Sequence, residues 1–269
     1  MTKGQPSPPR ECIFCLATGM TYEHVWPDWL KNYVPKTLSK HTALTEEIYT
    51  DHRNSSVKSW SGDPQSRRLP VVCERCNQGW MKDLQDAVKP IIVPLLDAKP
   101  TLIGPYNQKL LAAWIAMCIM TGEYYSPEQA AIPFKDREYL RLYREAPKDW
   151  RIWIGRYLRG RWNGYWVHHS LPIAEDGAKW DNNPPPAPNT QTTTFIVGQL
   201  FIHAFSSSVP GITDKWRLDE PGRPFLAQLW PPKESFIAWP TNDISDRAAG
   251  EIAGYIFWQL DSIARVFGH

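Results

Sequence analysis

The sequence predicts an α+β protein with a zinc-bound N-terminal domain and a C-terminal mixed α/β domain. Two Cys-x-x-Cys turns separated by short strand-like and helical runs predict the first domain. A long apolar helical run followed by aromatic and β-branched runs predicts the second. With 269 residues the chain has room for this division. We predict a flexible tail over residues 1–10, the zinc domain over 11–100 and the second domain over 101–269.

The N-terminal part predicts a strand, a helix, an insertion, a strand and a second helix, in that order. A one-sided apolar pattern after Pro27, with Asp28 as a candidate N-cap, predicts the first helix. Clusters of Thr, Ser, Asp and Asn predict the insertion, which carries strand-like runs near residues 48–49 and 57–60. The expected ranges are 22–26, 28–34, 39–68, 69–72 and 77–88.

The C-terminal part begins after a proline-rich stretch. Four prolines between Pro90 and Pro105 predict a break in regular structure, and we place the domain boundary there. Apolar and amphipathic patterns then predict two helices, and β-branched and aromatic runs predict three strands, the first two of them neighbours. The capping candidates Thr241, Asn242 and Asp243 precede a final helix. The expected helices span 107–124, 133–144 and 244–266, and the expected strands span 151–158, 164–169 and 192–205.

The bulk properties exclude several classes of protein. The longest apolar run, around Cys118, is too short to span a bilayer, and the N-terminus has no apolar stretch typical of a secretory signal. We therefore expect a soluble cytoplasmic protein without a membrane partner, in which thiols stay reduced. A net charge of +2 is nearly neutral, so any contact with nucleic acid must come from local basic patches.

Four of the five cysteines form two Cys-x-x-Cys turns, and they are Cys12, Cys15, Cys73 and Cys76. Four thiolates complete a tetrahedral zinc site without a water ligand, which is typical of a closed structural site. The distance along the chain between the two pairs exceeds that of a simple zinc ribbon, in agreement with an insertion inside the finger. The sequence therefore predicts one structural zinc ion.

The dipeptide Glu23-His24 lies between the two turns, Pro27 follows it, and Asn77 comes directly after the second turn. This order resembles the motif of the HNH endonuclease family over roughly residues 10–90. The resemblance implies a β-hairpin and a helix around one divalent cation, in a ββα-metal or treble-clef-like finger with a neighbouring zinc.

The resemblance also implies roles for these residues. Glu23 and Asn77 would hold a catalytic Mg²⁺ or Mn²⁺ ion, for which an asparagine oxygen is a suitable ligand. His24 would face the scissile phosphate, and an imidazole that can take a proton near pH 7 is the natural general base. The cation would act as a Lewis acid. The implied reaction is hydrolysis of DNA phosphodiester bonds, and nucleases of this type are often parts of phage or defence modules.

Four arginines are weaker candidates for contacts with nucleic acid, and they are Arg68, Arg75, Arg156 and Arg159. Arg68 stands five residues before Cys73, where the family has its middle asparagine, so the sequence does not say what orients the catalytic histidine. Arg156 and Arg159 alternate with aromatic residues in a predicted hairpin that could lie along a phosphate backbone. A solvated sheet face would explain the same pattern.

Two other interpretations stay open. A non-catalytic, zinc-stabilised module could keep the fold and bind nucleic acid or sense a ligand. Arg68 in the middle position favours that interpretation, whereas the presence of Glu23, His24 and Asn77 favours the nuclease. Alternatively, the C-terminal domain could bind a small ligand or a protein and hold the nuclease silent. The oligomeric state stays open as well.

Overall fold

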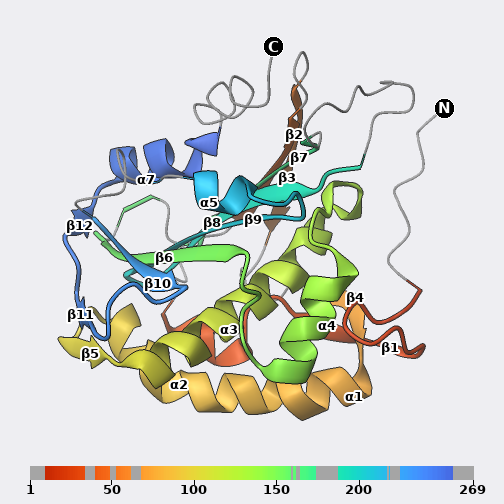
Figure 1. Ribbon diagram of the computed structural model, residues 1–269, viewed down its shortest axis with the longest axis horizontal. Coiled ribbons are helices and arrows are strands. Elements are labelled where there is room, and N and C mark those ends of the chain that lie inside the picture. The colour runs from red at the N-terminus through yellow and green to blue at the C-terminus, as the bar shows by residue number, and fades with distance from the viewer. Residues whose placement is uncertain are drawn as a thin grey trace.

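A computed structural model describes residues 10–33, 40–48, 53–61, 68–158, 160–161, 164–173, 187–216, 218 and 225–256. The described chain forms a central eight-stranded sheet with helices on both faces, and two small two-stranded sheets lie beside it (Figure 1). The predicted α+β class is confirmed.

The structure contains both strands and helices throughout the chain. The strands are β1 (Met20–His24), β2 (Lys40–Ile48), β3 (Arg53–Ser61), β4 (Arg68–Cys73), β5 (Thr101–Ile103), β6 (Trp150–Tyr157), β7 (Trp166–Leu171), β8 (Thr190–Val197), β9 (Leu200–Ser207), β10 (Leu226–Trp230), β11 (Ile237–Trp239) and β12 (Asp243–Ile244). The helices are α1 (Glu74–Cys76), α2 (Lys82–Leu96), α3 (Pro105–Gly122), α4 (Phe134–Tyr143), α5 (Ile212–Lys215) and α7 (Asp246–Ala253), with the short turns η1 (Asp28–Asn32), η3 (Asn77–Met81), η4 (Glu123–Tyr125) and η5 (Pro127–Gln129).

Strands β1 and β4 pair antiparallel and form one of the small sheets, although the insertion separates them in the sequence. A helical segment follows β4 through α1, the turn η3 and α2, with a kink at Gly79, whose backbone is not helical. The strand pair and this helix place the first cysteine turn, the Glu23-His24 dipeptide and the second cysteine turn side by side.

The central sheet has the strand order β10-β6-β9-β8-β7-β2-β3, and β12 pairs with β6. The insertion contributes β2 and β3, an antiparallel pair whose strand β2 runs parallel to β7, with Leu44 opposite Val167. The strands expected near residues 48–49 and 57–60 are therefore present, and they are longer than predicted. This hairpin extends a sheet that is otherwise built from the C-terminal half of the chain.

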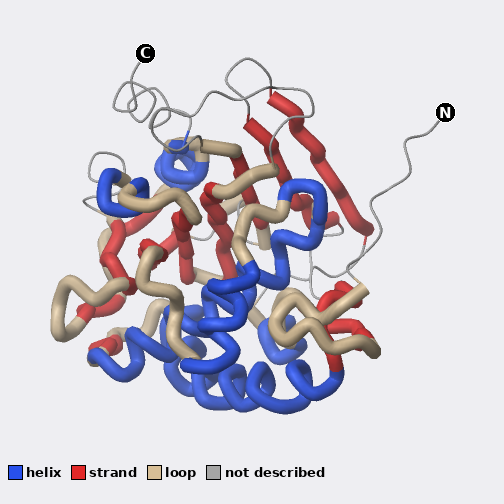
Figure 2. Tube along the Cα trace, turned by 45° about the vertical axis from the view of Figure 1, so that its right-hand side comes forward, coloured by secondary structure: helices blue, strands red, loops and turns tan. Residues whose placement is uncertain are grey.

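Helices cover both faces of the central sheet, as the turned view in Figure 2 also shows. Every residue of α3 from Leu111 to Gly122 is buried, because this helix lies between α2 and the sheet. On the other face, α5 packs against β9, and α7 packs against β8 and β12. Ile212, Ile252 and Phe205 belong to the hydrophobic cluster on that face. The larger hydrophobic cluster runs from Cys12 to Trp239, across residue 100. The domain boundary at that position stays a prediction.

Helix α2 shows that the expected break after residue 88 was wrong. The helix continues through Pro90 and Pro94 to Leu96. A proline inside a helix removes one backbone donor and frees a carbonyl, which is least costly where water can replace the lost bond. Pro90 is exposed, whereas Val88 and Ile92 face the core, so packing on one side holds the helix together.

Two strand predictions in the C-terminal half were also wrong. The run 192–205 forms two strands, β8 and β9, joined by a tight turn in which Gly198 has a left-handed φ of 58°. The strands β6 and β7 are not neighbours, because β9 and β8 lie between them. The predicted basic and aromatic hairpin therefore does not exist.

The predicted caps of two helices were misplaced. Helix α7 begins at Asp246, where the Ser245 side chain accepts a hydrogen bond from the backbone N–H of Ala248 at 3.2 Å. Asp243 instead belongs to β12. Asp28 is the first residue of a short 3₁₀ turn, with Pro27 in the capping position. Residues 257–266, the rest of the predicted final helix, lie outside the described residues, as do residues 1–9 of the predicted tail.

Candidate metal centre and catalytic site

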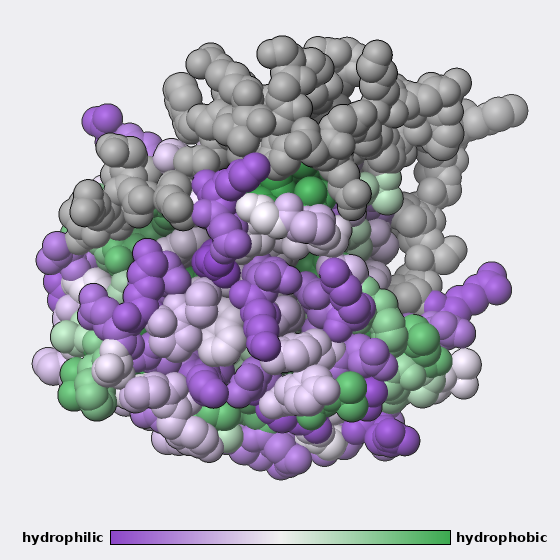
Figure 3. All heavy atoms as spheres, in the orientation of Figure 1, coloured by the Kyte–Doolittle hydropathy of each residue, from purple (hydrophilic) through white to green (hydrophobic). Residues whose placement is uncertain are grey.

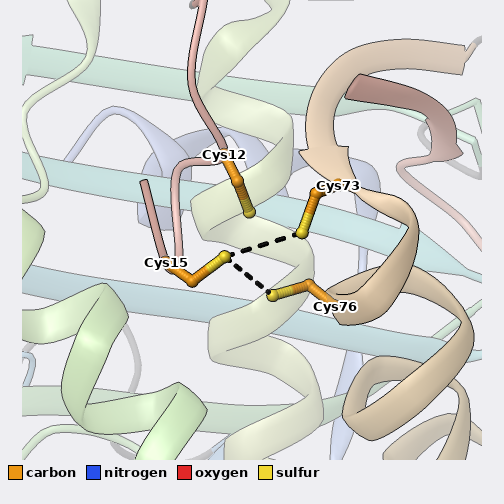
Figure 4. A group of neighbouring side chains, drawn as sticks. All are labelled: Cys12, Cys15, Cys73 and Cys76. Carbon is orange, nitrogen blue, oxygen red and sulfur yellow. Dashed lines mark hydrogen bonds between the residues drawn. The ribbon is translucent and has the colours of Figure 1, made fainter. Parts of the chain in front are cut away.

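The four cysteines of the predicted zinc site come together from two separate turns (Figure 4). The first turn closes with hydrogen bonds from the backbone N–H of Cys12 to the carbonyl of Ala17 and from the N–H of Leu16 to the carbonyl of Cys12, at 2.8 and 2.9 Å. The backbone N–H of Ile13 donates to the carbonyl of Val71 at 3.0 Å, which fixes this turn beside β4. The other pair lies at the end of β4 and in α1.

The geometry of the sulfur atoms fits a tetrahedral metal. All four Sγ atoms lie within 4.8 Å of one another, with the Sγ of Cys15 3.5 Å from that of Cys73 and 3.6 Å from that of Cys76. Zinc–thiolate bonds of about 2.3 Å in a tetrahedron place the sulfurs about 3.8 Å apart. The hydrogen bond between the two thiols lowers the pKa of Cys12 and raises that of Cys76, so Cys12 is the one of the two that favours the thiolate form. The cluster can hold a metal ion such as zinc.

Glu23 and Asn77, the predicted ligands of a second cation, also lie together. Glu23 is 6% exposed, and its Oε1 accepts a hydrogen bond from the Nε2 of Gln85 at 3.3 Å. The Asn77 side chain donates to the Oγ1 of Thr21 at 3.2 Å, and it also hydrogen-bonds to the Glu23 carboxyl. Burial raises the pKa of that carboxyl to about 7, although both amides oppose the shift.

The strand geometry separates Glu23 from His24. Successive side chains of a strand point to opposite sides, so Glu23 is buried against the helix while His24 is half-buried on the other side. The register of β1 and β4 shifts between Thr21 and Glu23, which bends the pair at this point.

His24 lies directly opposite Arg68 on the paired strand. The Nε of Arg68 donates a hydrogen bond to the Nε2 of His24 at 2.9 Å. Burial lowers the pKa of His24, and the positive charge of Arg68 lowers it further, so both favour the neutral imidazole. The arginine at the middle position of the motif therefore contacts the predicted catalytic histidine.

The arginines predicted to contact nucleic acid do not form one group. Arg75 is exposed on α1, beside the cysteine cluster. Arg156 lies on β6 in an ion pair with Asp243, and its position on the central sheet favours the structural interpretation. Arg159 lies outside the described residues. The predicted roles in binding nucleic acid stay predictions.

Gln85 and Thr21 are the site residues that the sequence did not reveal. Gln85 follows Asn77 by eight residues, about two helical turns, and only this spacing could have indicated it. Thr21 precedes Glu23 by two residues, and such alternation places both on the same side of a strand.

Comparisons with protein families, with curated proteins and with solved structures found no match. Within the described part of the chain, no helix is both long and apolar enough to cross a membrane. Hydrophilic residues cover most of the described face that Figure 3 draws.

Proposed function

We propose that this protein is a metal-dependent endonuclease of the HNH type, which hydrolyses DNA phosphodiester bonds with His24 as the general base. One observation carries the proposal. The buried carboxyl of Glu23 meets the amides of Asn77 and Gln85, and the next residue along the strand is a half-buried histidine.

The surroundings of Glu23 favour a bound cation. A buried carboxylate is costly unless a positive charge or several hydrogen bonds compensate for it. Within the described chain no side chain forms an ion pair with Glu23, and burial dominates its pKa. A divalent ion such as Mg²⁺ or Mn²⁺ would supply the missing charge, with a carboxylate oxygen and the Asn77 oxygen as suitable ligands.

The residues of the site would then have separate roles in the reaction. Glu23 and Asn77 would hold the cation, which would supply a Lewis acid for the charge on the phosphate and on the departing oxygen. His24 takes the proton of the attacking water, and its lowered pKa keeps it neutral for that role near pH 7. The four cysteines would hold zinc, which fixes β4 and α1 against the first turn. The zinc would then act as a scaffold and take no part in the reaction.

A non-catalytic module that binds nucleic acid is the second candidate. The observation that favours it is the contact between Arg68 and His24, because that contact occupies the nitrogen a general base needs. The C-terminal half would serve as a recognition or regulatory part in either case.

Cleavage of supercoiled plasmid by His24→Ala tests the proposal. We expect the variant to lose about 10²-fold or more of the wild-type rate while its zinc content stays unchanged, because general-base catalysis contributes about that much and zinc uses other ligands. Lys109→Ala, an exposed change on α3, is the control and should retain the wild-type rate. A fully active His24→Ala protein would place the active site elsewhere.

A further inference from the structure

Arg68 stands where the HNH family has an asparagine, and its contact with His24 has a chemical consequence. The two residues are cross-strand partners, and the guanidinium Nε donates to the imidazole Nε2 at 2.9 Å. Arg68 is exposed, so solvent and ligands can reach the guanidinium group.

The direction of this hydrogen bond fixes the state of the imidazole. Arginine stays protonated in proteins and can only donate, so the His24 Nε2 must be the acceptor. A neutral imidazole has one nitrogen with a free lone pair and one that carries a proton, and the partner of one nitrogen sets the proton on the other. The proton therefore lies on Nδ1, and the lone pair of Nε2 is already used. In this state His24 has no free nitrogen with which to accept a proton from water.

We infer that Arg68 blocks the Nε2 of His24 in the free protein by this hydrogen bond, which we call the cap, and that a backbone phosphate of the substrate draws Arg68 away. This inference rests on the proposed function of His24. The bond from Arg68 to the neutral imidazole carries charge on the donor alone. A bond to a phosphate oxygen joins two opposite charges, and the guanidinium can bind phosphate with two N–H groups at once.

The exchange needs no other reactant. Arg68 exchanges its N–H···N bond to His24 for N–H···O bonds to the phosphate, and no proton is transferred in this exchange. Within the described chain no carboxylate forms an ion pair with Arg68 that would compete. The Nε2 of His24 is then free to take the proton of a water molecule, so the base becomes active only when a phosphodiester is present.

The tautomer of His24 tests this inference, read from the imidazole ¹⁵N resonances of the zinc-loaded full chain without Mg²⁺ or Mn²⁺. We expect the wild type to carry its proton on Nδ1. In Arg68→Met, which keeps the aliphatic stem but loses the donors, the proton should move largely to Nε2. Arg247→Met removes an equal charge from an exposed position on α7 and should resemble the wild type. Adding a short DNA duplex to the wild type should shift its tautomer toward that of Arg68→Met.

Two results would overturn the inference: a wild type with its proton on Nε2, or a capped wild type whose tautomer does not respond to the duplex. Steady-state cleavage adds a second readout. Arg68→Met should raise KM about tenfold or more, the size of one charge-assisted hydrogen bond, without lowering kcat. A tenfold fall in kcat with unchanged KM would contradict the exchange. A protein that shows the cap and its release but never cleaves DNA would refute the proposed function and leave this inference standing.

Discussion

Glu23 is buried, and its burial raises the pKa of its carboxyl. The carboxyl is 6% exposed and faces neutral amides, so its charged form lacks the stabilisation of water. With its pKa raised to about 7, this carboxyl holds its proton at a higher pH than an exposed glutamate does. Binding of a divalent ion would displace that proton, since metal ligands must be deprotonated.

The three site residues should respond differently to added cation. If Glu23 and Asn77 hold the ion as proposed, Glu23→Gln and Asn77→Ala should weaken its binding, and at low Mg²⁺ we expect cleavage to fall by at least about 10-fold. Higher Mg²⁺ or Mn²⁺ should restore part of it by mass action. His24→Ala lacks the base, and no cation concentration should restore it. Rates measured over a series of Mg²⁺ concentrations check this prediction, and rescue of all three variants alike would contradict it.

Helices and turns could be predicted from the sequence where a local pattern alone decides the structure. The long apolar run became α3, and the two cysteine turns came together as their spacing indicated. The prediction from local pattern failed for α2, where packing against residues distant in the sequence holds the helix together. Helix α2 tolerates the exposed Pro90 and the half-buried Pro94 because Val88 and Ile92 pack against the core.

The site shows the same division. Glu23, His24 and Asn77 could be selected from motif order, since Glu23-His24 lies between the two cysteine turns and Asn77 directly follows the second. The sequence placed Arg68 at the middle position of the motif but did not predict its contact with His24. The partner of a residue across a strand pair depends on the register, and the register of β1 and β4 shifts between Thr21 and Glu23. Gln85 reaches the site through a π-helical turn that no sequence pattern indicated.

The segment after α3 depends on a buried ion pair. Arg137 of α4 pairs with the fully buried Glu123, whose other oxygen accepts hydrogen bonds from the backbone N–H groups of Ala131 and Ile132 at 2.9 and 3.2 Å. Arg137→Met would leave that carboxylate without its charge partner. We expect a loss of about 3–5 kcal/mol in the free energy of unfolding, measured by urea denaturation.

The exposed pair of Lys82 and Asp86 on α2 provides the control for this prediction. Both side chains are more than half exposed, at 58% and 65%, so water and salt screen the pair. Lys82→Met should cause no measurable change. Equal effects of the two substitutions would show that the buried pair does not hold the segment.

The N-terminal and C-terminal halves of the chain contribute to the same central sheet and to the same hydrophobic cluster. The hairpin β2–β3 comes from the N-terminal insertion and extends the central sheet beside β7. Side chains from both halves meet in the larger hydrophobic cluster. We therefore expect cooperative unfolding, in which the metal centre and the central sheet are lost together.

Two buried histidines of the central sheet predict how stability depends on pH. Burial lowers the pKa values of His168 and His203 to about 3, below the ordinary value of 6.5. The unfolded chain therefore binds more protons between these values, and stability present above pH 6.5 is lost as the pH falls toward 3. Each histidine should contribute about 1.4 kcal/mol per pH unit within that window.

His203→Asn tests this effect. Asparagine can still hydrogen-bond to Thr194, whose Oγ1 lies 2.8 Å from the Nδ1 of His203, but it does not titrate. The slope of unfolding free energy against pH, measured by urea denaturation between about pH 6 and pH 4, should fall by about 1.4 kcal/mol per unit relative to the wild type. An unchanged slope would mean that the histidine is protonated in the folded state.

We propose that zinc holds the fold while a different metal ion serves the reaction. Cleavage of supercoiled plasmid by the zinc-loaded protein, followed before and after Mg²⁺ is added, tests it most directly. We predict intact plasmid with zinc alone and cleavage once Mg²⁺ is present. Equal cleavage with and without Mg²⁺ would assign the reaction to the zinc, and plasmid that stays intact with Mg²⁺ and with Mn²⁺ would contradict the nuclease and favour the binding module.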